Sequence, residues 1–369
     1  MVFLGQYLFS SAIIIESNPI ITNRNMKIKE HIPLSKHSTM RLGGKARFFA
    51  TVKSREDIAK AAAWAKEYRQ PVVMIGKGSN IVWTDKGFDG LVLVNELKRF
   101  EIFKEDDTNV FVTAGSGELW DDVVAKTVKK GFSGVETLSL IPGTTGAAPV
   151  QNIGAYGQEI RNVLVNVEAY DRQAESIVTI PNLDCRFGYR TSRFKSEDKG
   201  RFLISAITLH LTTNMLSPPF YDSLQAYLTQ NKVTDYSVKN IRNAVVAIRS
   251  SKLPNPDKIA NNGSFFENPI VTISKLKSLQ KTFPSIYFWD LGNGTAKLSA
   301  AWMMDAAGFK DYHDPATGMG TWPLQSLVLI NEKAKTTRQL IEFRQMIVVK
   351  IRYLFGIELV QEPELLGTL

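Results

Sequence analysis

The sequence predicts a two-domain protein of the α+β class. At 369 residues the chain is longer than one hydrophobic core usually serves, so two domains are expected. Helical and strand patterns alternate in the first half, strands dominate from Val163 to Leu211, and helices dominate the last third. We therefore expect an N-terminal domain over residues 26–235 and a smaller C-terminal domain over residues 236–369.

The first half begins with a well-marked helix. Ser54 and Asp57 have the spacing of a capping box, and Ile58, Ala62 and Ala65 follow at helical spacing before Pro71 stops the helix. Short apolar runs then predict strands over 71–76, 91–94 and 109–117, and an amphipathic pattern predicts a helix over 119–131 that ends on a glycine.

The second half changes from strands to helices. Three runs of β-branched or alternating residues between 163 and 211 predict strands, and the polar stretch from Leu216 to Tyr236, with Pro218-Pro219, predicts a connection or an excursion from the first domain. Beyond it we expect helices over 237–250, 273–281, 298–307 and 337–355, followed by a last strand at IELV, residues 357–360.

Composition narrows the class of ligand. The formal charge of +9 favours anionic partners, and because the basic residues are scattered rather than clustered, phosphorylated small molecules are favoured over nucleic acid. A single cysteine, Cys185, and four histidines without ligand spacing predict no metal site. Residues 1–25 have an apolar patch that is too short to span a bilayer and lacks signal-peptide flanks, so we expect an extension without function.

Two glycine-rich segments are candidate ligand loops. GKGSN, Gly76 to Asn80, is neither a Walker loop nor a dinucleotide fingerprint, and taken by itself it is read as a plain turn rather than a ligand loop. PGTTGAAPVQNIGAYGQEI, from Pro142 to Ile160, carries four glycines and three alanines. Such a segment can form a wall of backbone against a flat or polyanionic ligand, or a tight loop packed on a sheet.

Five motifs in the same order resemble the UDP-N-acetylenolpyruvoylglucosamine reductase family. They are GKGSN, GVETLSLIPGTTGAAPVQNIGAYGQEI, CRFGYRTSRFK, SSKLPNP and NNGSFFENP, and the resemblance extends from about Ile32 to Leu366. It implies a two-part FAD-binding domain of the vanillyl-alcohol-oxidase type, followed by a smaller α+β substrate-binding domain. The excursion at 216–236 resembles type I members of the family.

The resemblance implies an NADPH-dependent reductase with non-covalent FAD. Such an enzyme reduces UDP-N-acetylglucosamine enolpyruvate to UDP-N-acetylmuramate in peptidoglycan precursor synthesis. It would be a cytoplasmic monomer without a nucleic-acid, membrane or protein partner. The residues matching the family's cofactor contacts are Arg41, Gly76, Lys77, Gly78, Ser79, Asn80, Pro142, Gly143, Gly146, Ala147, Gly154, Ala155, Tyr156 and Gly157.

Three residues match the family's catalytic positions. Arg190 would bind the substrate carboxylate, Ser264 would donate a proton, and Glu364 would assist at the enediolate, with Glu362 as the alternative for the same position. Outside their motifs, Arg190 would be read as a residue of a surface strand and Ser264 as a turn or cap residue. The matching substrate contacts are Tyr189, Tyr221, Lys252, Asn268 and Gln325.

The sequence departs from the family pattern at two places, and two other functions remain open. Trp322-Pro323 stands where many members have a histidine, and SKLPNP replaces SKLPDP, which affects details of the pocket rather than the reaction. The alternatives are a flavin oxidoreductase acting on an unrelated alcohol and a non-enzymatic flavin or nucleotide-sugar sensor. Retention of Arg190, Ser264 and Glu364 argues against both.

Overall fold

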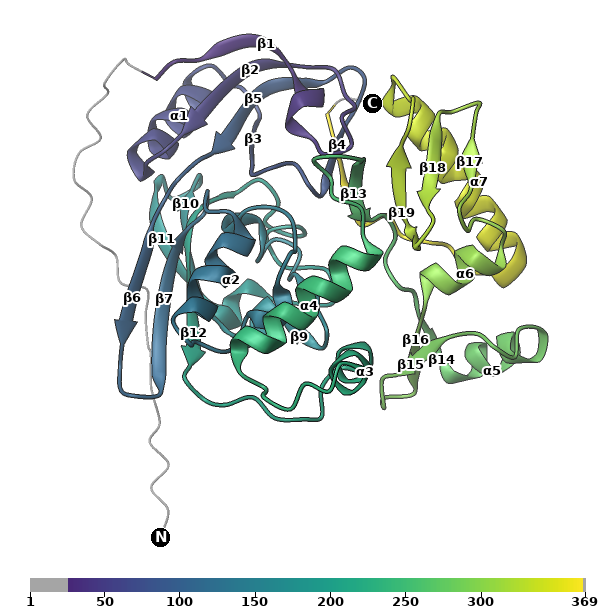
Figure 1. Ribbon diagram of the computed structural model, residues 1–369. Coiled ribbons are helices and arrows are strands. Elements are labelled where there is room, and N and C mark those ends of the chain that lie inside the picture. Colours follow the sequence, from purple (N-terminus) through teal and green to yellow (C-terminus); the bar gives the residue numbers. More distant parts are fainter. Residues whose placement is uncertain (1–25, 368–369) are drawn as a thin grey trace.

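The computed structural model describes residues 26–367, which form two domains side by side (Figure 1). The expectation of a functionless extension over residues 1–25 lies outside the described residues. The first domain contains a four-stranded and a five-stranded sheet, and the second contains a four-stranded and a three-stranded sheet with helices against them (Figure 1).

The first sheet has strand order β1-β2-β5-β3 and is mostly parallel. Helix α1 packs against it and begins with the predicted capping box, in which Ser54 and Asp57 bond to each other's backbone N–H groups. The elements are β1 (Lys29–Pro33), η1 (Leu34–His37), β2 (Lys45–Val52), α1 (Arg55–Glu67), β3 (Val72–Ile75), β4 (Ile81–Trp83) and β5 (Phe88–Asn95).

The second sheet is antiparallel throughout, with strand order β11-β10-β12-β7-β6. Its alternating Val, Ile and Leu side chains form a core with α2 and with the glycine-rich segment that follows it. The elements are β6 (Phe100–Lys104), β7 (Asn109–Gly115), α2 (Trp120–Lys129), η2 (Glu136–Leu138), η3 (Thr145–Ala147), β8 (Gly154–Ala155), β9 (Gln158–Glu159), η4 (Ile160–Asn162), β10 (Leu164–Asp171), β11 (Ser176–Pro181), η5 (Asn182–Cys185) and β12 (Phe202–Thr212).

The excursion after β12 contains a helix that the sequence patterns did not reveal. Helix α3 (Asp222–Gln230) packs against α4 (Val238–Lys252) through a shared apolar cluster that includes Leu224, Leu228 and Ile241. Helix α4 also contacts α2 and η2 of the first domain (Figure 1). The predicted boundary at residue 235 would divide this cluster, so the packing favours a boundary after α4, and we propose one near Leu253.

The C-terminal domain is built on one large apolar core. Helix α7 is amphipathic, begins with a capping box of Thr336 and Gln339, and ends at Gly356 in the left-handed conformation. The elements are β13 (Ala260–Ser264), β14 (Ile270–Thr272), α5 (Ile273–Thr282), β15 (Phe288–Asp290), β16 (Thr295–Leu298), α6 (Ala300–Ala306), β17 (His313–Asp314), β18 (Met319–Trp322), β19 (Gln325–Asn331), α7 (Thr337–Phe355) and β20 (Glu364–Leu366). The sheets have orders β13-β19-β18-β17 and β14-β16-β15.

The last strand is not where its apolar pattern predicted it. The prediction of a strand at residues 357–360 is wrong, because Ile357 and Leu359 are buried in the core of the C-terminal domain without pairing in a ladder. Pairing begins later, where β20 runs parallel to β4 and so returns the end of the chain to the first domain.

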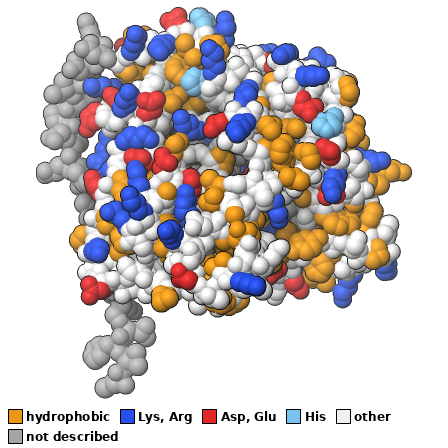
Figure 2. Space-filling view, in the orientation of Figure 1, with side chains coloured by type: hydrophobic (Ala, Val, Ile, Leu, Met, Phe, Trp, Pro, Cys, Tyr) orange, Lys and Arg blue, Asp and Glu red, His pale blue; other side chains and the backbone are white. Residues whose placement is uncertain are grey.

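The surface agrees with the scattered distribution of charge in the sequence. On the face shown in Figure 2, Lys and Arg side chains are interspersed with Asp and Glu. Within residues 26–367, no helix combines the length and the apolarity that crossing a membrane would need. Over the same residues, no three His, Cys, Asp or Glu side chains are gathered as a metal site would require.

Candidate active site

The main cavity lies between the two sheets of the first domain and has a volume of about 560 Å³. Residues of β3 and β12 line it on opposite sides, and both glycine-rich segments contribute to its wall. The predicted cofactor residues that line it are Gly76, Lys77, Gly78, Ser79, Asn80, Pro142, Gly143, Gly146 and Ala147. A cavity of this size accommodates a small-molecule cofactor.

The two glycine-rich segments pack against each other to form one wall. A Cβ atom on Gly76 would lie 2.1 Å from the Oγ1 atom of Thr144, and Gly143 has a φ of 123° that a larger residue would not adopt. The Ser79 hydroxyl donates to the carbonyl oxygen of Pro142 at 3.1 Å. Both alternatives predicted for the segment from Pro142 to Ile160 therefore hold. It packs against the protein as a loop, and its backbone forms a wall that faces a cavity.

This wall fits the FAD that the family resemblance implies. Backbone N–H groups in a concave glycine-rich loop suit a diphosphate, and the apolar walls between the sheets suit a flat ring system. The residues that would hold the cofactor are those of Gly76 to Asn80 and of Pro142 to Ala147.

The other predicted cofactor residues are not among those that line this cavity. The Arg41 guanidinium donates to the carbonyl oxygens of Pro256 and Asp257, at 3.0 and 2.7 Å, and lines a second cavity of about 340 Å³ between the domains. Gly154, Ala155, Tyr156 and Gly157 form the β8–β9 hairpin. This hairpin faces Arg190 and Tyr221 instead.

Arg190 is held at the junction of the two domains. Its Nη2 atom donates to the carbonyl oxygen of Gly154 at 3.0 Å, and its Nε atom lies 3.4 Å from the Oε1 atom of Glu362. The two side chains are only 21% and 12% exposed. Burial raises the pKa of Glu362, although the neighbouring Arg190 opposes that shift.

The two candidate carboxylates have different partners. The structure pairs Arg190 with Glu362, the alternative, whereas Glu364 lines the main cavity and forms an ion pair with Lys199. Glu362 donates its backbone N–H to the carbonyl oxygen of Phe265, beside Ser264, and Glu364 donates its own to Asn80. The segment from 362 to 364 therefore links the Ser264 region to the first glycine loop.

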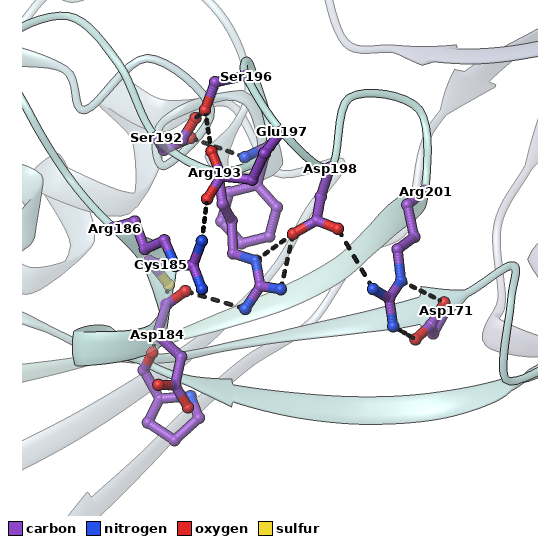
Figure 3. Close-up of polar contacts among 12 residues, drawn as sticks. Asp171, Asp184, Cys185, Arg186, Ser192, Arg193, Ser196, Glu197, Asp198 and Arg201 are labelled. Carbon is purple, nitrogen blue, oxygen red and sulfur yellow. Dashed lines mark hydrogen bonds and ion pairs between the residues drawn. The ribbon is translucent and has the colours of Figure 1, made fainter.

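A chain of arginines and carboxylates supports the loop that carries Arg190, residues 186–201 (Figure 3). Asp198 lies between two guanidinium groups, 2.7 Å from Nε of Arg193 and 3.2 Å from Nη1 of Arg201, and Arg201 also pairs with Asp171 at 2.7 Å. Burial alone would raise the pKa of Asp171, but the hydrogen bonds from Arg201 outweigh it and hold that pKa below its ordinary value. The loop of residues 186–201 is thus anchored to Asp171 of β10.

Cys185 lies in the same region and is not reactive (Figure 3). The side chain is buried, and burial raises the pKa of its thiol to about 12. A thiol that remains protonated at neutral pH is a poor nucleophile.

Two partly buried cations near Arg190, Lys297 and Arg249, were missed by the sequence analysis. The Lys297 Nζ atom lies 5.4 Å from the ring centre of Tyr189 and 5.1 Å from that of Trp289, and burial lowers the pKa of Lys297. Burial also lowers the pKa of Arg249, whose Nε atom has no hydrogen-bond partner among the described residues. Cations that are buried without carboxylate partners are suited to an anionic ligand.

Comparison with known proteins decides the family. Residues 46–180 match the model of an FAD binding domain, and residues 255–366 match that of the UDP-N-acetylenolpyruvoylglucosamine reductase C-terminal domain. The UDP-N-acetylenolpyruvoylglucosamine reductase of Ralstonia nicotianae is 40% identical over 336 residues, which cover 90% of this chain and 97% of that relative. The chain belongs to the UDP-N-acetylenolpyruvoylglucosamine reductase family.

Further relatives agree. The reductase of Flavobacterium johnsoniae is 36% identical over 338 residues, which cover 91% of this chain and 99% of that relative. A crystal structure of UDP-N-acetylenolpyruvylglucosamine reductase from Thermus caldophilus superposes with a TM-score of 0.64 at 19% identity, over 92% of this chain and 99% of that one. The predicted family, the α+β fold with an FAD-binding domain, and the class of FAD-containing oxidoreductase are confirmed.

The substrate contacts predicted from the reductase family differ in their partners and in their exposure to solvent. Tyr221 precedes α3 and meets Tyr156 edge to face at 6.0 Å. Lys252 is exposed at the end of α4, and its carbonyl oxygen accepts a hydrogen bond from the indole of Trp322 at 2.9 Å. This contact gives the departure at Trp322 a structural role.

The remaining two predicted contacts of the reductase family lie in the C-terminal domain. The Asn268 side chain accepts a hydrogen bond from the backbone N–H of Ala300 at 2.9 Å, at the start of α6. Gln325 is partly exposed at the start of β19. Ser264 is exposed at the end of β13.

Proposed function

We propose that this protein reduces UDP-N-acetylglucosamine enolpyruvate to UDP-N-acetylmuramate with NADPH and a non-covalently bound FAD. The observation that carries the proposal is the convergence at one cavity of both glycine-rich segments, Lys199 and Glu364, with the pair of Arg190 and Glu362 beside it. An excess of positive charge, +9 in all, suits two polyanionic reactants that visit one site.

Each catalytic residue has a role that its chemistry supports. The residues of Gly76 to Asn80 and of Pro142 to Ala147 would hold FAD, which would supply the hydride-transfer chemistry between NADPH and the alkene of the enolpyruvyl group. Arg190 would bind the substrate carboxylate, since a planar guanidinium matches its two oxygen atoms. Ser264 would supply the proton to the carbon next to the carboxylate, and Glu364 would hydrogen-bond the enediolate as its charge develops.

The nucleotide part of the substrate would lie at the junction of the domains. Tyr189, Tyr221, Lys252, Asn268 and Gln325 are its proposed contacts. Lys297 and Arg249 are partly buried cations near Arg190 and support binding of an anion there. The product would serve peptidoglycan synthesis and, through cell wall biogenesis, cell shape, the cell cycle and cell division. We further propose a cytoplasmic monomer that needs no protein partner, membrane or nucleic acid.

An absorbance experiment tests the proposal. The purified protein should be yellow, should lose its colour when NADPH is added without oxygen, and should regain it when the enolpyruvyl UDP-sugar is added. A preparation that is bleached by NADPH but not recoloured by this sugar would instead be a flavin oxidoreductase with another substrate. A yellow preparation that NADPH never bleaches would support the sensor alternative and overturn the proposal.

A further inference from the structure

Three ion pairs join the loop of residues 186–201 in the first domain to carboxylates of the C-terminal domain. They are Arg190 with Glu362 at 3.4 Å, Lys195 with Glu267 at 3.6 Å, and Lys199 with Glu364. The first pair contains Arg190, a proposed catalytic residue, and Glu362, the alternative to Glu364. The third pair contains Glu364 itself. The pair of Lys195 and Glu267 has no assigned role in the proposed function, although Lys195 also lines the main cavity.

Lys195 contacts the main chain of Arg190 directly. Its Nζ atom donates a hydrogen bond to the carbonyl oxygen of Arg190 at 3.1 Å. The Lys195 side chain is only 22% exposed. Arg190 has a φ of 54°, in the left-handed region that a residue with a Cβ atom adopts only when its surroundings hold it there. The Lys195 ammonium is one of the groups that can hold it.

Glu267 fixes the other side of this contact in the C-terminal domain. Its backbone N–H donates to the carbonyl oxygen of Val360 at 2.9 Å, two residues before Glu362, and its side chain is 21% exposed. Burial raises the pKa of Glu267, and the nearby Lys195 opposes that shift. Because Glu267 follows Phe265 and Phe266, both buried, its backbone cannot move far without disturbing the core.

We propose that Lys195 and Glu267 are positioning residues that hold the backbone of Arg190 and so aim its guanidinium at the substrate carboxylate. The proposal rests on the proposed function, because it assumes that Arg190 binds that carboxylate. Neither side chain would touch the reacting atoms. The pair would instead transmit the relative placement of the two domains to the one arginine on which carboxylate binding depends.

The competing explanation is that the pair only fastens the domains together. In that case its loss would lower stability and would add to the effect of losing Arg190. If the pair acts through Arg190, however, its loss should add nothing once the guanidinium is gone. The two explanations therefore differ in a double-mutant cycle.

The experiment uses full-length protein with its FAD and measures the two half-reactions separately by stopped-flow absorbance. We expect Glu267→Gln, which alters a residue outside the lining of the main cavity, to slow reoxidation by the enolpyruvyl UDP-sugar on the order of 10- to 100-fold, while bleaching by NADPH stays within about twofold. Lys195→Met should slow reoxidation to the same extent, with the rates expressed per bound flavin because Lys195 lines the cavity assigned to FAD. Lys195→Arg keeps both contacts and should restore most of the rate. In an Arg190→Ala background, Lys195→Met should cause no further loss.

A binding measurement gives a readout that does not depend on turnover. Calorimetric titration with UDP-N-acetylmuramate should show weaker binding to Lys195→Met, whereas the nucleotide UDP, which lacks the carboxylate, should bind as it does to the unaltered protein. The matched control is Lys126→Met, which removes a lysine 3.5 Å from Glu118 in the first domain, and it should change neither.

The outcomes separate the inference from the function on which it rests. If the unaltered protein is not reoxidised by the enolpyruvyl sugar, the proposed function fails. If the unaltered protein is reoxidised and both variants match it, or if Lys195→Met lowers the rate equally with and without Arg190, the positioning role is overturned. Glu267→Gln preserves side-chain volume, so it decides the matter if Lys195→Met does not fold.

Discussion

Arg242 and Asp121 form two parallel hydrogen bonds, from Nη1 to Oδ1 at 2.7 Å and from Nη2 to Oδ2 at 2.9 Å, which join α4 to α2. Asp121 also accepts the backbone N–H of Leu140, and Arg242 donates to the hydroxyl of Ser139, both at 2.7 Å. A paired guanidinium and carboxylate is among the strongest polar contacts in proteins. These bonds hold Ser139 and Leu140, which lie just before the second glycine-rich segment, against α2 and α4.

We expect Arg242→Met to destabilise the protein, because it leaves the partly buried Asp121 carboxylate without its cation. The Arg242 side chain is only 15% exposed, so the loss in the free energy of unfolding should be about 3 kcal/mol. Urea denaturation measures it. The control is Arg338→Met. The Arg338 side chain is 82% exposed, so its ion pair with Glu342 should contribute less than about 1 kcal/mol.

The same variant should change how stability depends on pH. Burial raises the pKa of Asp121, but hydrogen bonds from Arg242 and Leu140 outweigh it, so the pKa in the folded protein is lowered. A lowered pKa stabilises the fold above the pKa of the unfolded chain, and this stabilisation is lost as the pH falls through the folded value. The difference between Arg242→Met and the unaltered protein should therefore shrink in acid, and a constant difference would contradict this.

Glu136 should give the opposite dependence on pH. It is buried in η2, and burial raises its pKa despite hydrogen bonds from backbone N–H groups, that of Gly134 among them. A raised pKa favours the fold below the unfolded value, and this contribution is lost as the pH rises through the folded value. Relative to the unaltered protein, Glu136→Gln should therefore gain stability as the pH rises from the unfolded pKa of a glutamate through its raised value in the folded protein. Urea midpoints at both ends of that range measure the trend, and no trend would contradict it.

Gly76→Ala should impair retention of FAD. Its new Cβ atom would meet the Thr144 side chain, so the two glycine-rich segments must separate, at about 1–3 kcal/mol. The ratio of flavin absorbance to protein absorbance in the purified variant measures retention. Gly131→Ala is the control, because its site has a φ of 80° but no atom within 4 Å, so it should keep its flavin. A Gly76→Ala protein with full flavin content would show that the close contact of the two segments is not required.

Ser264→Ala should separate the two half-reactions. NADPH should still bleach the flavin, whereas reoxidation by the enolpyruvyl sugar should slow by roughly 10² to 10⁴, the usual contribution of a positioned proton donor. Stopped-flow absorbance measures both steps. Unchanged rates in both would remove Ser264 from the mechanism.

A comparison of Glu362→Gln with Glu364→Gln should identify the carboxyl group that assists the chemistry. Glu364 lines the main cavity, so its variant should lose reoxidation by the sugar while it retains FAD. Glu362 faces Arg190, so its variant should mainly raise the KM for the sugar by freeing that guanidinium to move. If the two patterns are exchanged, the assignment of the two glutamates is reversed.

Local patterns in the sequence predicted much of the fold. The expected helix over 337–355 coincides with α7, because the amphipathic repeat and the glycine that follows it indicate the same limits that the capping box of Thr336 and Gln339 and the left-handed Gly356 set in the structure. Residues 357–360 failed as a strand because their apolar side chains fill the core of the C-terminal domain instead of pairing. The predicted domain boundary lies between α3 and α4, because the polar composition of residues 216–236 concealed the apolar cluster that these two neighbouring helices share.

The site was less accessible to sequence reasoning, because its geometry depends on partners far apart in the chain. Glu362 and Glu364 are two residues apart, a spacing that puts both side chains on the same side of an extended chain. Only the fold pairs one with Arg190 and the other with Lys199. Lys297 and Arg249 carried no motif, and only their burial beside aromatic rings and other cations reveals them.

The parallel pairing of β20 with β4 means that the first domain is completed by residues that follow the C-terminal domain core in the chain. The side chain of Asn80 reaches the carbonyl oxygen of Glu362 across 282 positions, so one edge of the first glycine-rich segment is complete only when residues on both sides of the C-terminal domain core are present. Contacts between residues this distant carry a loop-closure cost that local contacts do not, so we expect them to form late in folding. A nascent chain that has not yet reached Glu362 therefore lacks part of the wall of the cofactor cavity.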